Sequence, residues 1–132
     1  MTPELKWLAA TALFTGLVWV PYILALLAQM GVGKALMDGQ HATALEAPWA
    51  QRAKRAHANA VENLVVFAAL VLVLHAANVG TALTAKAAMI FFVSRVGHWG
   101  VYVLGLPLIR TLLFAVGFAC QMIIGLTIFG VL

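Results

Sequence analysis

Four long apolar stretches account for most of this chain. They are residues 7–28, residues 64–74 with their flanks, residues 87–109 and residues 111–132. The first and last contain 22 residues each without a charged side chain, whereas Arg95 and His98 interrupt the third. A membrane-spanning helix needs about 20 mostly apolar residues. The pattern therefore predicts an all-α membrane protein, a four-transmembrane-helix bundle that occupies residues 1–132 as one domain.

Composition supports the bilayer as the expected solvent. Hydrophobic residues make up 64% of the chain and charged residues 9%, whereas soluble domains carry about 25% charged residues. The net charge of +4 does not indicate nucleic acid, because the basic residues are clustered beside apolar stretches. The single cysteine, Cys120, excludes an intrachain disulfide and a cysteine-based metal site, and we expect it to be a packing residue. We expect no metal.

The basic residues also predict the orientation. Six of the eight Lys and Arg residues lie in or near the first and third connections, and only Lys6 and Lys86 mark the other side. Cytoplasmic connections carry an excess of positive charge. The chain is therefore expected to be a multi-pass protein of a bacterial inner membrane, with both termini outside. The six residues are Lys34, Arg52, Lys54, Arg55, Arg95 and Arg110.

Proline and glycine residues predict where the helices begin and end. Pro21 is expected to kink the first span, and Pro48 to open the second helix after a polar loop over residues 34–48. The second helix is expected over residues 49–78. Thirty residues make a helix of about 45 Å, which exceeds the bilayer core of about 30 Å. The charged first turns of this helix should therefore project into the headgroups.

Three groups of polar residues are expected at one depth near the cytoplasmic side. Each of the first two groups shares a helix face by its spacing, and the third follows Pro107. An arginine inside a span usually faces the bundle interior. Three arginines against one glutamate leave an excess of positive charge that a bound anion would offset. The groups are Arg55, Asn59 and Glu62; Arg95, His98 and Tyr102; and Arg110 with Thr111.

Simpler interpretations exist for some of these residues. Glu62 and Arg95 could form a buried ion pair that only fixes the register of two helices. Arg52 and Lys54 could be anchors for lipid headgroups. Neither interpretation accounts for all the polar residues expected at this level, so a ligand site is favoured.

Three motifs resemble the MAPEG family, the membrane-associated proteins in eicosanoid and glutathione metabolism. They are R-A-x-x-N-x-x-E-N from Arg55, R-x-x-H-x-x-x-Y from Arg95 and P-x-x-R-T from Pro107. The resemblance implies a four-helix protomer, a homotrimer and a glutathione site between subunits near the cytoplasmic face. Together with the alanine stripe Ala53, Ala56 and Ala60, it predicts that the second helix lies near the three-fold axis.

The resemblance also implies roles for individual residues. Arg110 matches the arginine proposed to activate the thiol, and is the candidate catalytic residue. His57 matches a position that reaches in from the adjacent subunit, and Lys34 matches an arginine position loosely. Ala58 departs from the arginine of some catalytic members. The remaining candidates for binding glutathione are Arg55, Asn59, Glu62, Arg95, His98, Tyr102 and Thr111.

Glutathione chemistry fits these residue types. Arginines bind its two carboxylates, and Glu62 suits its ammonium group. Arg110 beside the sulfur would lower the thiol pKa and favour the reactive thiolate. The chain is therefore expected to be a glutathione transferase or peroxidase acting on lipophilic substrates from the membrane. The alternative is a non-catalytic lipid-binding or scaffold protein of the same fold; a small transporter or channel subunit is disfavoured because no repeat symmetry is visible.

The predicted orientation can be tested with reporter fusions. A reporter that is active only in the periplasm, fused to the C-terminus, should be active because both termini are expected outside. A fusion within the first connection should be inactive. The reverse pattern would contradict the orientation and place the polar groups away from the cytoplasmic glutathione.

Overall fold

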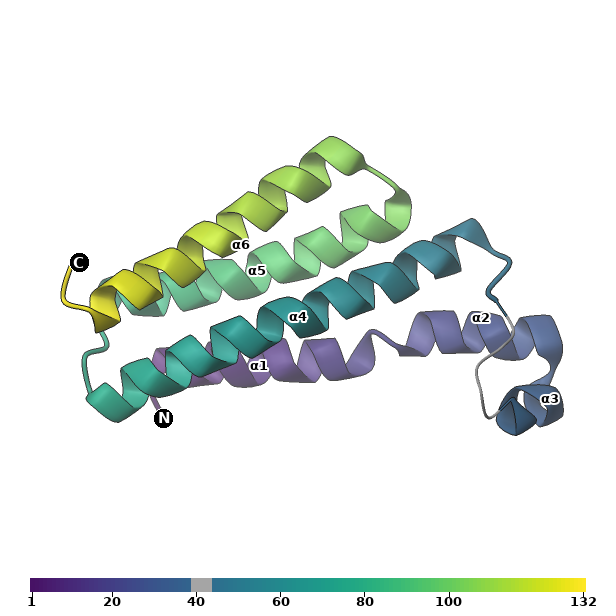
Figure 1. The fold of residues 1–132 in the computed structure, drawn as a ribbon, viewed down its shortest axis with the longest axis horizontal. Helices are drawn as coiled ribbons and strands as arrows, with labels where there is room; N and C mark the ends of the chain where they lie inside the picture. Colours follow the sequence, from purple (N-terminus) through teal and green to yellow (C-terminus); the bar gives the residue numbers. More distant parts are fainter. Residues whose placement is uncertain (39–43) are drawn as a thin grey trace.

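A computed structural model describes residues 1–38 and 44–132 and contains only helices in these parts (Figure 1). Four candidate membrane spans are long and apolar enough to cross a bilayer, and α1 and α2 together form the first. The predicted all-α class is confirmed, and the four predicted spans correspond to these four candidates. The helices are α1 (Pro3–Leu17), α2 (Val20–Met30), α3 (Val32–Met37), α4 (Pro48–Ala77), α5 (Ala82–Leu104) and α6 (Pro107–Ile128).

The long helices run up and down in sequence. In Figure 1 both termini lie at the end of the bundle where α4 ends and α5 begins, whereas the α5–α6 turn and α3 lie at the opposite end. This arrangement agrees with the predicted placement of both termini on one side of the membrane. It also brings the start of α4, the end of α5 and the start of α6 to the same end of the bundle.

Local sequence signals explain the helix boundaries. Pro48 and Pro107 occupy the first turns of α4 and α6, where a missing backbone N–H costs no hydrogen bond. Thr81 and Thr84 form a capping box at the start of α5, which satisfies two backbone donors. Gly105 ends α5 with φ 78°, a left-handed conformation that glycine adopts without strain. The predicted opening of the second helix at Pro48 is therefore confirmed.

Pro21 interrupts the first span as predicted. Its ring nitrogen cannot donate to the carbonyl of Leu17, and α1 ends at Leu17 while α2 begins at Val20. The short helix α3 was not predicted, because its residues belong to the expected loop over residues 34–48 or to the glycine-containing end of the first span. Residues 39–43 of that loop lie outside the described residues.

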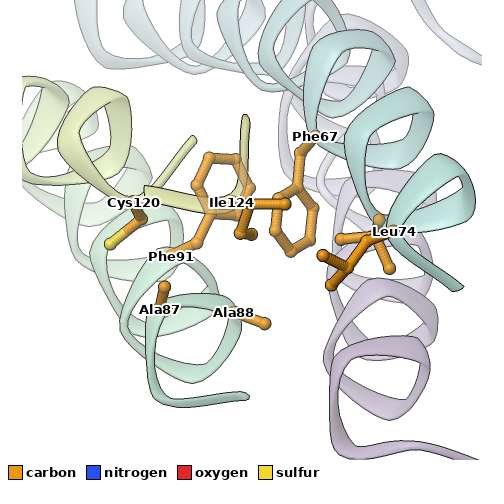
Figure 2. Close-up of a cluster of buried hydrophobic side chains, with 8 residues drawn as sticks. Phe67, Leu74, Ala87, Ala88, Phe91, Cys120 and Ile124 are labelled. Carbon is orange, nitrogen blue, oxygen red and sulfur yellow. The ribbon is translucent and has the colours of Figure 1, made fainter. Parts of the chain in front are cut away.

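The core is built around two stacked phenylalanines (Figure 2). The rings of Phe67 in α4 and Phe91 in α5 are stacked with centroids 3.9 Å apart and planes at 16°, and both are 0% exposed. Cys120 is a free cysteine packed in the same cluster, which confirms its packing role. The other members are Val71, Leu74, Ala87, Ala88 and Ile124.

The alanine stripe of α4 is buried inside the protomer. Ala53 and Ala56 are 0% exposed and Ala60 is buried too, so these small side chains allow close packing within one chain. They are therefore not available to a neighbouring subunit. The stripe therefore does not support a trimer in which α4 contacts its neighbours through these alanines. The predicted homotrimer rests on the family resemblance.

Replacement of Phe67 by alanine should destabilise the bundle. Truncating a buried phenylalanine costs about 3–5 kcal/mol in soluble cores. Part of that cost is the lost transfer of the side chain from water, and this part is small when the surrounding solvent is lipid. We therefore expect a loss near the lower limit, about 3 kcal/mol, measured by thermal unfolding in detergent. Phe118→Ala is the matched control because Phe118 is 51% exposed. Equal effects of the two substitutions would contradict the assigned core.

Candidate functional site

A cleft opens between α4, α5 and α6 at the end of the bundle that holds the α5–α6 turn. Its volume is about 270 Å³. Five of its six lining residues were predicted as site residues from the sequence, and Phe114 adds an apolar wall. The structure thus brings residues from three helices into one polar cleft. The lining residues are Asn59, His98, Tyr102, Arg110, Thr111 and Phe114.

Arg95 lies buried beside this cleft. Its side chain is 3% exposed. Its Nη2 donates to Asn59 Oδ1 and lies 3.1 Å from His98 Nδ1. Its Nε and Nη1 are buried and have no hydrogen-bond partner among the described residues. A buried guanidinium with unsatisfied donors is costly in an apolar interior, so this position holds an excess of both positive charge and hydrogen-bond donors.

Asn63 fixes the orientation of the Asn59 amide. The Nδ2 atom of Asn63 donates to the Asn59 backbone oxygen at 2.9 Å and lies 3.3 Å from Asn59 Oδ1. Two donors, from Arg95 and Asn63, therefore meet the same side-chain oxygen. The amide nitrogen of Asn59 is left available to an acceptor in the cleft that Asn59 lines.

Gln121 extends this network into α6. Its Nε2 donates to the backbone oxygen of Asn63 at 3.2 Å, and the Gln121 side chain is buried. The bond connects α6 to α4 beneath the cleft. Sequence analysis included Asn63 in the motif from Arg55 without giving it a role, and it missed Gln121. A signal existed for Gln121, because a buried amide in an apolar span usually bonds to a neighbouring helix.

Arg110 is held over an aromatic ring. Its Cζ lies 4.6 Å from the centroid of Tyr102, a distance typical of a cation–π contact. The His98 ring packs edge-on against Tyr102 with centroids 5.7 Å apart. Thr111 Oγ1 donates to the Pro107 oxygen at 3.0 Å, so its lone pairs can accept while its proton is engaged. The Arg110 guanidinium therefore has a defined position at the cleft.

Other predicted site residues lie outside the cleft. Arg55 is exposed beside a separate hollow lined by Lys54, and Glu62 is also exposed. Helical periodicity places Arg55, Asn59 and Glu62 within a sector of about 60°. Within this sector only Asn59 faces the cleft, whereas Arg55 and Glu62 lie on the exposed surface of the bundle. Among the described residues, Glu62 forms no ion pair with Arg95, and the ion-pair interpretation is wrong for this protomer.

His57 and Lys34 are also outside the cleft. The Nδ1 atom of His57 lies 2.8 Å from the hydroxyl oxygen of Tyr22, a hydrogen bond that joins α4 to α2. Lys34 is exposed on α3. Within one protomer, therefore, neither residue reaches the polar cleft.

Arg52 has a contact that sequence analysis did not foresee. Its Nε donates to the backbone oxygen of Val103 at 2.8 Å, which ties α4 to the last turn of α5. A Cβ atom at Gly105 would lie 3.4 Å from the same nitrogen, so the turn passes close to this side chain. Arg52 is thus held by the protein itself, beyond any role as a headgroup anchor.

Comparison with protein families identifies the class. Residues 7–130 match the model of the MAPEG family. The chain belongs to the MAPEG family, whose members are typically glutathione-dependent transferases or peroxidases. No curated protein and no solved structure matches the chain.

The Asn59–Arg95 contact can be tested by its effect on stability. Asn59→Ala should cost about 1.5–3 kcal/mol, because a buried guanidinium loses its acceptor. Thermal unfolding of the ligand-free protein measures this loss. The exposed Lys54 on the same helix supplies the control, since Lys54→Ala should change stability by less than about 0.5 kcal/mol.

A double-mutant cycle isolates the contact. Combining Asn59→Ala with Arg95→Met should give a coupling of about 0.5–3 kcal/mol. Strictly additive effects would mean that the two side chains do not interact in the folded protein.

Proposed function

We propose that this protein is a membrane-embedded glutathione transferase or peroxidase acting on lipophilic substrates. One observation carries the proposal: Arg95 is buried, two of its nitrogens have no partner among the described residues, and the six residues found to line the neighbouring cleft include a second arginine and no carboxylate. Such a site favours an anion that brings several acceptors. Membership of the MAPEG family makes glutathione the expected anion.

The groups of glutathione can be matched to the cleft. A carboxylate that enters beside Arg95 would accept from the guanidinium and from the free amide nitrogen of Asn59. The thiol would lie near Arg110, whose guanidinium is positioned by the Tyr102 ring. His98 and Thr111 complete the polar wall. This assignment leaves the glutathione ammonium group without an acidic partner in the protomer's own cleft.

A second subunit would supply what the cleft lacks. Arg55 and Glu62 are exposed on α4, and Lys34 is exposed on α3. We propose a homotrimer in which such surface residues, with His57, complete the glutathione site of a neighbour. Glu62 would then meet the ammonium group, and Arg55 the second carboxylate. The split of the predicted residues between cleft and outer surface supports this intersubunit site.

The chemistry follows from the thiolate. A thiol with an ordinary pKa of about 8.5 is mostly protonated at neutral pH, and the positive charge of Arg110 would lower the pKa of the bound thiol. The thiolate then attacks an electrophilic carbon and forms a thioether. It either displaces a leaving group, which departs with its bonding electron pair, or adds to an activated alkene, whose neighbouring carbon takes up the π electron pair and then a proton. With a hydroperoxide it attacks an oxygen instead, giving an alcohol and a sulfenic acid, and a second glutathione converts the sulfenic acid to disulfide and water.

A non-catalytic lipid-binding protein is the second candidate. A groove of about 570 Å³ runs along the exposed face of α1, and apolar residues alone line it. Such a surface suits a lipid chain whether or not chemistry follows. The lining residues are Ala9, Ala12, Leu13, Gly16 and Leu17.

Arginine substitutions separate binding from activation. Arg95→Ala or Arg55→Ala should weaken glutathione binding by about 30-fold or more, since losing a charged partner costs about 2–5 kcal/mol. Arg110→Ala should leave the dissociation constant within about threefold and lower turnover of a lipophilic electrophile by about 10²-fold. Calorimetry measures the binding, and thiolate absorbance near neutral pH reports the activation.

The outcomes distinguish the candidates. Wild-type protein that binds glutathione without thiolate absorbance or turnover would favour the non-catalytic candidate. Wild-type protein that does not bind glutathione would refute both the enzyme and the assigned site. Lys54→Ala is the control for general loss of positive charge, because this exposed lysine lies outside the cleft.

A further inference from the structure

A second cavity lies at the opposite end of the bundle, between the N-terminus and the turn that joins α4 to α5. Figure 1 shows this end of the bundle, where both termini lie. The volume of the cavity is about 310 Å³. Residues from the start of α1, the end of α4 and the start of α5 line it. Val71 and Leu74 form an apolar floor, and polar residues surround it: Thr2, Glu4, His75, Asn78 and Thr81.

Glu4 is the unusual residue of this cavity. It is 5% exposed, although carboxylates are rarely buried without a positive partner. Thr84 Oγ1 donates to Glu4 Oε1 at 2.6 Å. The other carboxylate oxygen, Oε2, accepts no hydrogen bond from the described residues, and no Lys, Arg or His among them forms an ion pair with Glu4. This oxygen is accessible to solvent, since it is not one of the buried atoms without a partner, and a ligand in the cavity can therefore reach it.

Two helix N-termini lie beside the Glu4 carboxylate. Glu4 lies in the first turn of α1 and touches the first turn of α5 through Thr84, and helix N-termini stabilise negative charge. Gly80 approaches closely, since a Cβ atom there would lie 3.2 Å from Glu4 Oε1. A side chain at Gly80 would therefore make a tight contact with the Glu4 carboxylate.

We propose that this cavity binds the primary ammonium group of an ethanolamine phospholipid. An ammonium group supplies the N–H donor and the positive charge that Glu4 Oε2 lacks. The cavity lies at the end of the spans, where lipid headgroups are found, and its apolar floor suits the ethylene group of the headgroup. His75 and Asn78 are exposed at its edge and can donate to the phosphate. This site is separate from the proposed glutathione site at the other end.

The proposal predicts discrimination by the number of N–H donors. Phosphatidylcholine has the same charge as phosphatidylethanolamine but no N–H group. Native mass spectrometry of the purified protein with both lipids, matched in acyl chains, should show binding of phosphatidylethanolamine about tenfold tighter, a difference of about 1.4 kcal/mol. The mono- and dimethylated headgroups should bind with intermediate affinity.

Two variants test the role of Glu4. Glu4→Gln keeps an oxygen for Thr84 but removes the charge, and should abolish the preference for ethanolamine. Glu46→Gln is the matched control. Glu46 is exposed and shortly precedes the start of α4, at the end of the bundle opposite to Glu4. Ala85→Leu narrows the cavity and keeps Glu4, so it should weaken binding of phosphatidylethanolamine even if Glu4→Gln does not fold.

Three results would overturn the proposal. They are equal binding of the ethanolamine and choline lipids, a preference that persists in both Glu4→Gln and Ala85→Leu, and full competition by soluble phosphoethanolamine, which would indicate a site for free amines. Glutathione binding should be unchanged in these variants, so failure here is distinguishable from failure of the proposed enzyme.

Discussion

A buried arginine constrains the packing of three helices in this protein. Insertion of arginine at the centre of a span costs about 2.5–3.5 kcal/mol, and Arg95 offsets part of this cost through bonds to Asn59 and His98. The bond to Asn59 requires α4 to lie beside α5 at that depth, whereas His98 is a neighbour of Arg95 within α5. Two nitrogens of the guanidinium have no partner among the described residues, so the protein retains unsatisfied donors next to Asn59 and His98, which line the cleft. The Arg95 side chain therefore contributes both to the packing of the helices and to the proposed binding of a ligand.

Further hydrogen bonds extend the polar network of Arg95 and Asn59 across α4 and α6. Asn63 orients the amide of Asn59, and Gln121 joins α6 to the backbone of α4. In lipid the hydrophobic effect does not drive helices together, so packing and interhelical hydrogen bonds carry more of the association. Phe67 and Phe91 supply the packing towards the terminal end, and the polar network supplies the bonds towards the cleft. The two halves of the bundle thus have different origins of stability.

The sequence predicted the features that depend on local order. Apolar length sets the number of spans, and Pro21 and Pro48 act on their own backbones. The cleft residues of α5 and α6 could also be predicted, because an interior-facing Arg95 fixes the face of its helix. The position of Arg55 and Glu62 could not, since the edge of the α4 interface depends on how neighbouring helices pack. The hydrogen bond between Glu4 and Thr84 could not be predicted from the sequence either, because it joins residues far apart in the chain.

The hydrogen bond from Arg52 to Val103 has a further consequence for the cleft. It fastens the last turn of α5 to α4, and α6 follows after only Gly105 and Leu106. Arg110 lies in the first turn of α6, so the hydrogen bond from Arg52 restrains the short turn that positions it. Such preorganisation reduces the conformational entropy that a ligand must overcome on binding. A side chain outside the cleft thereby helps to determine how rigidly the cleft presents its charge.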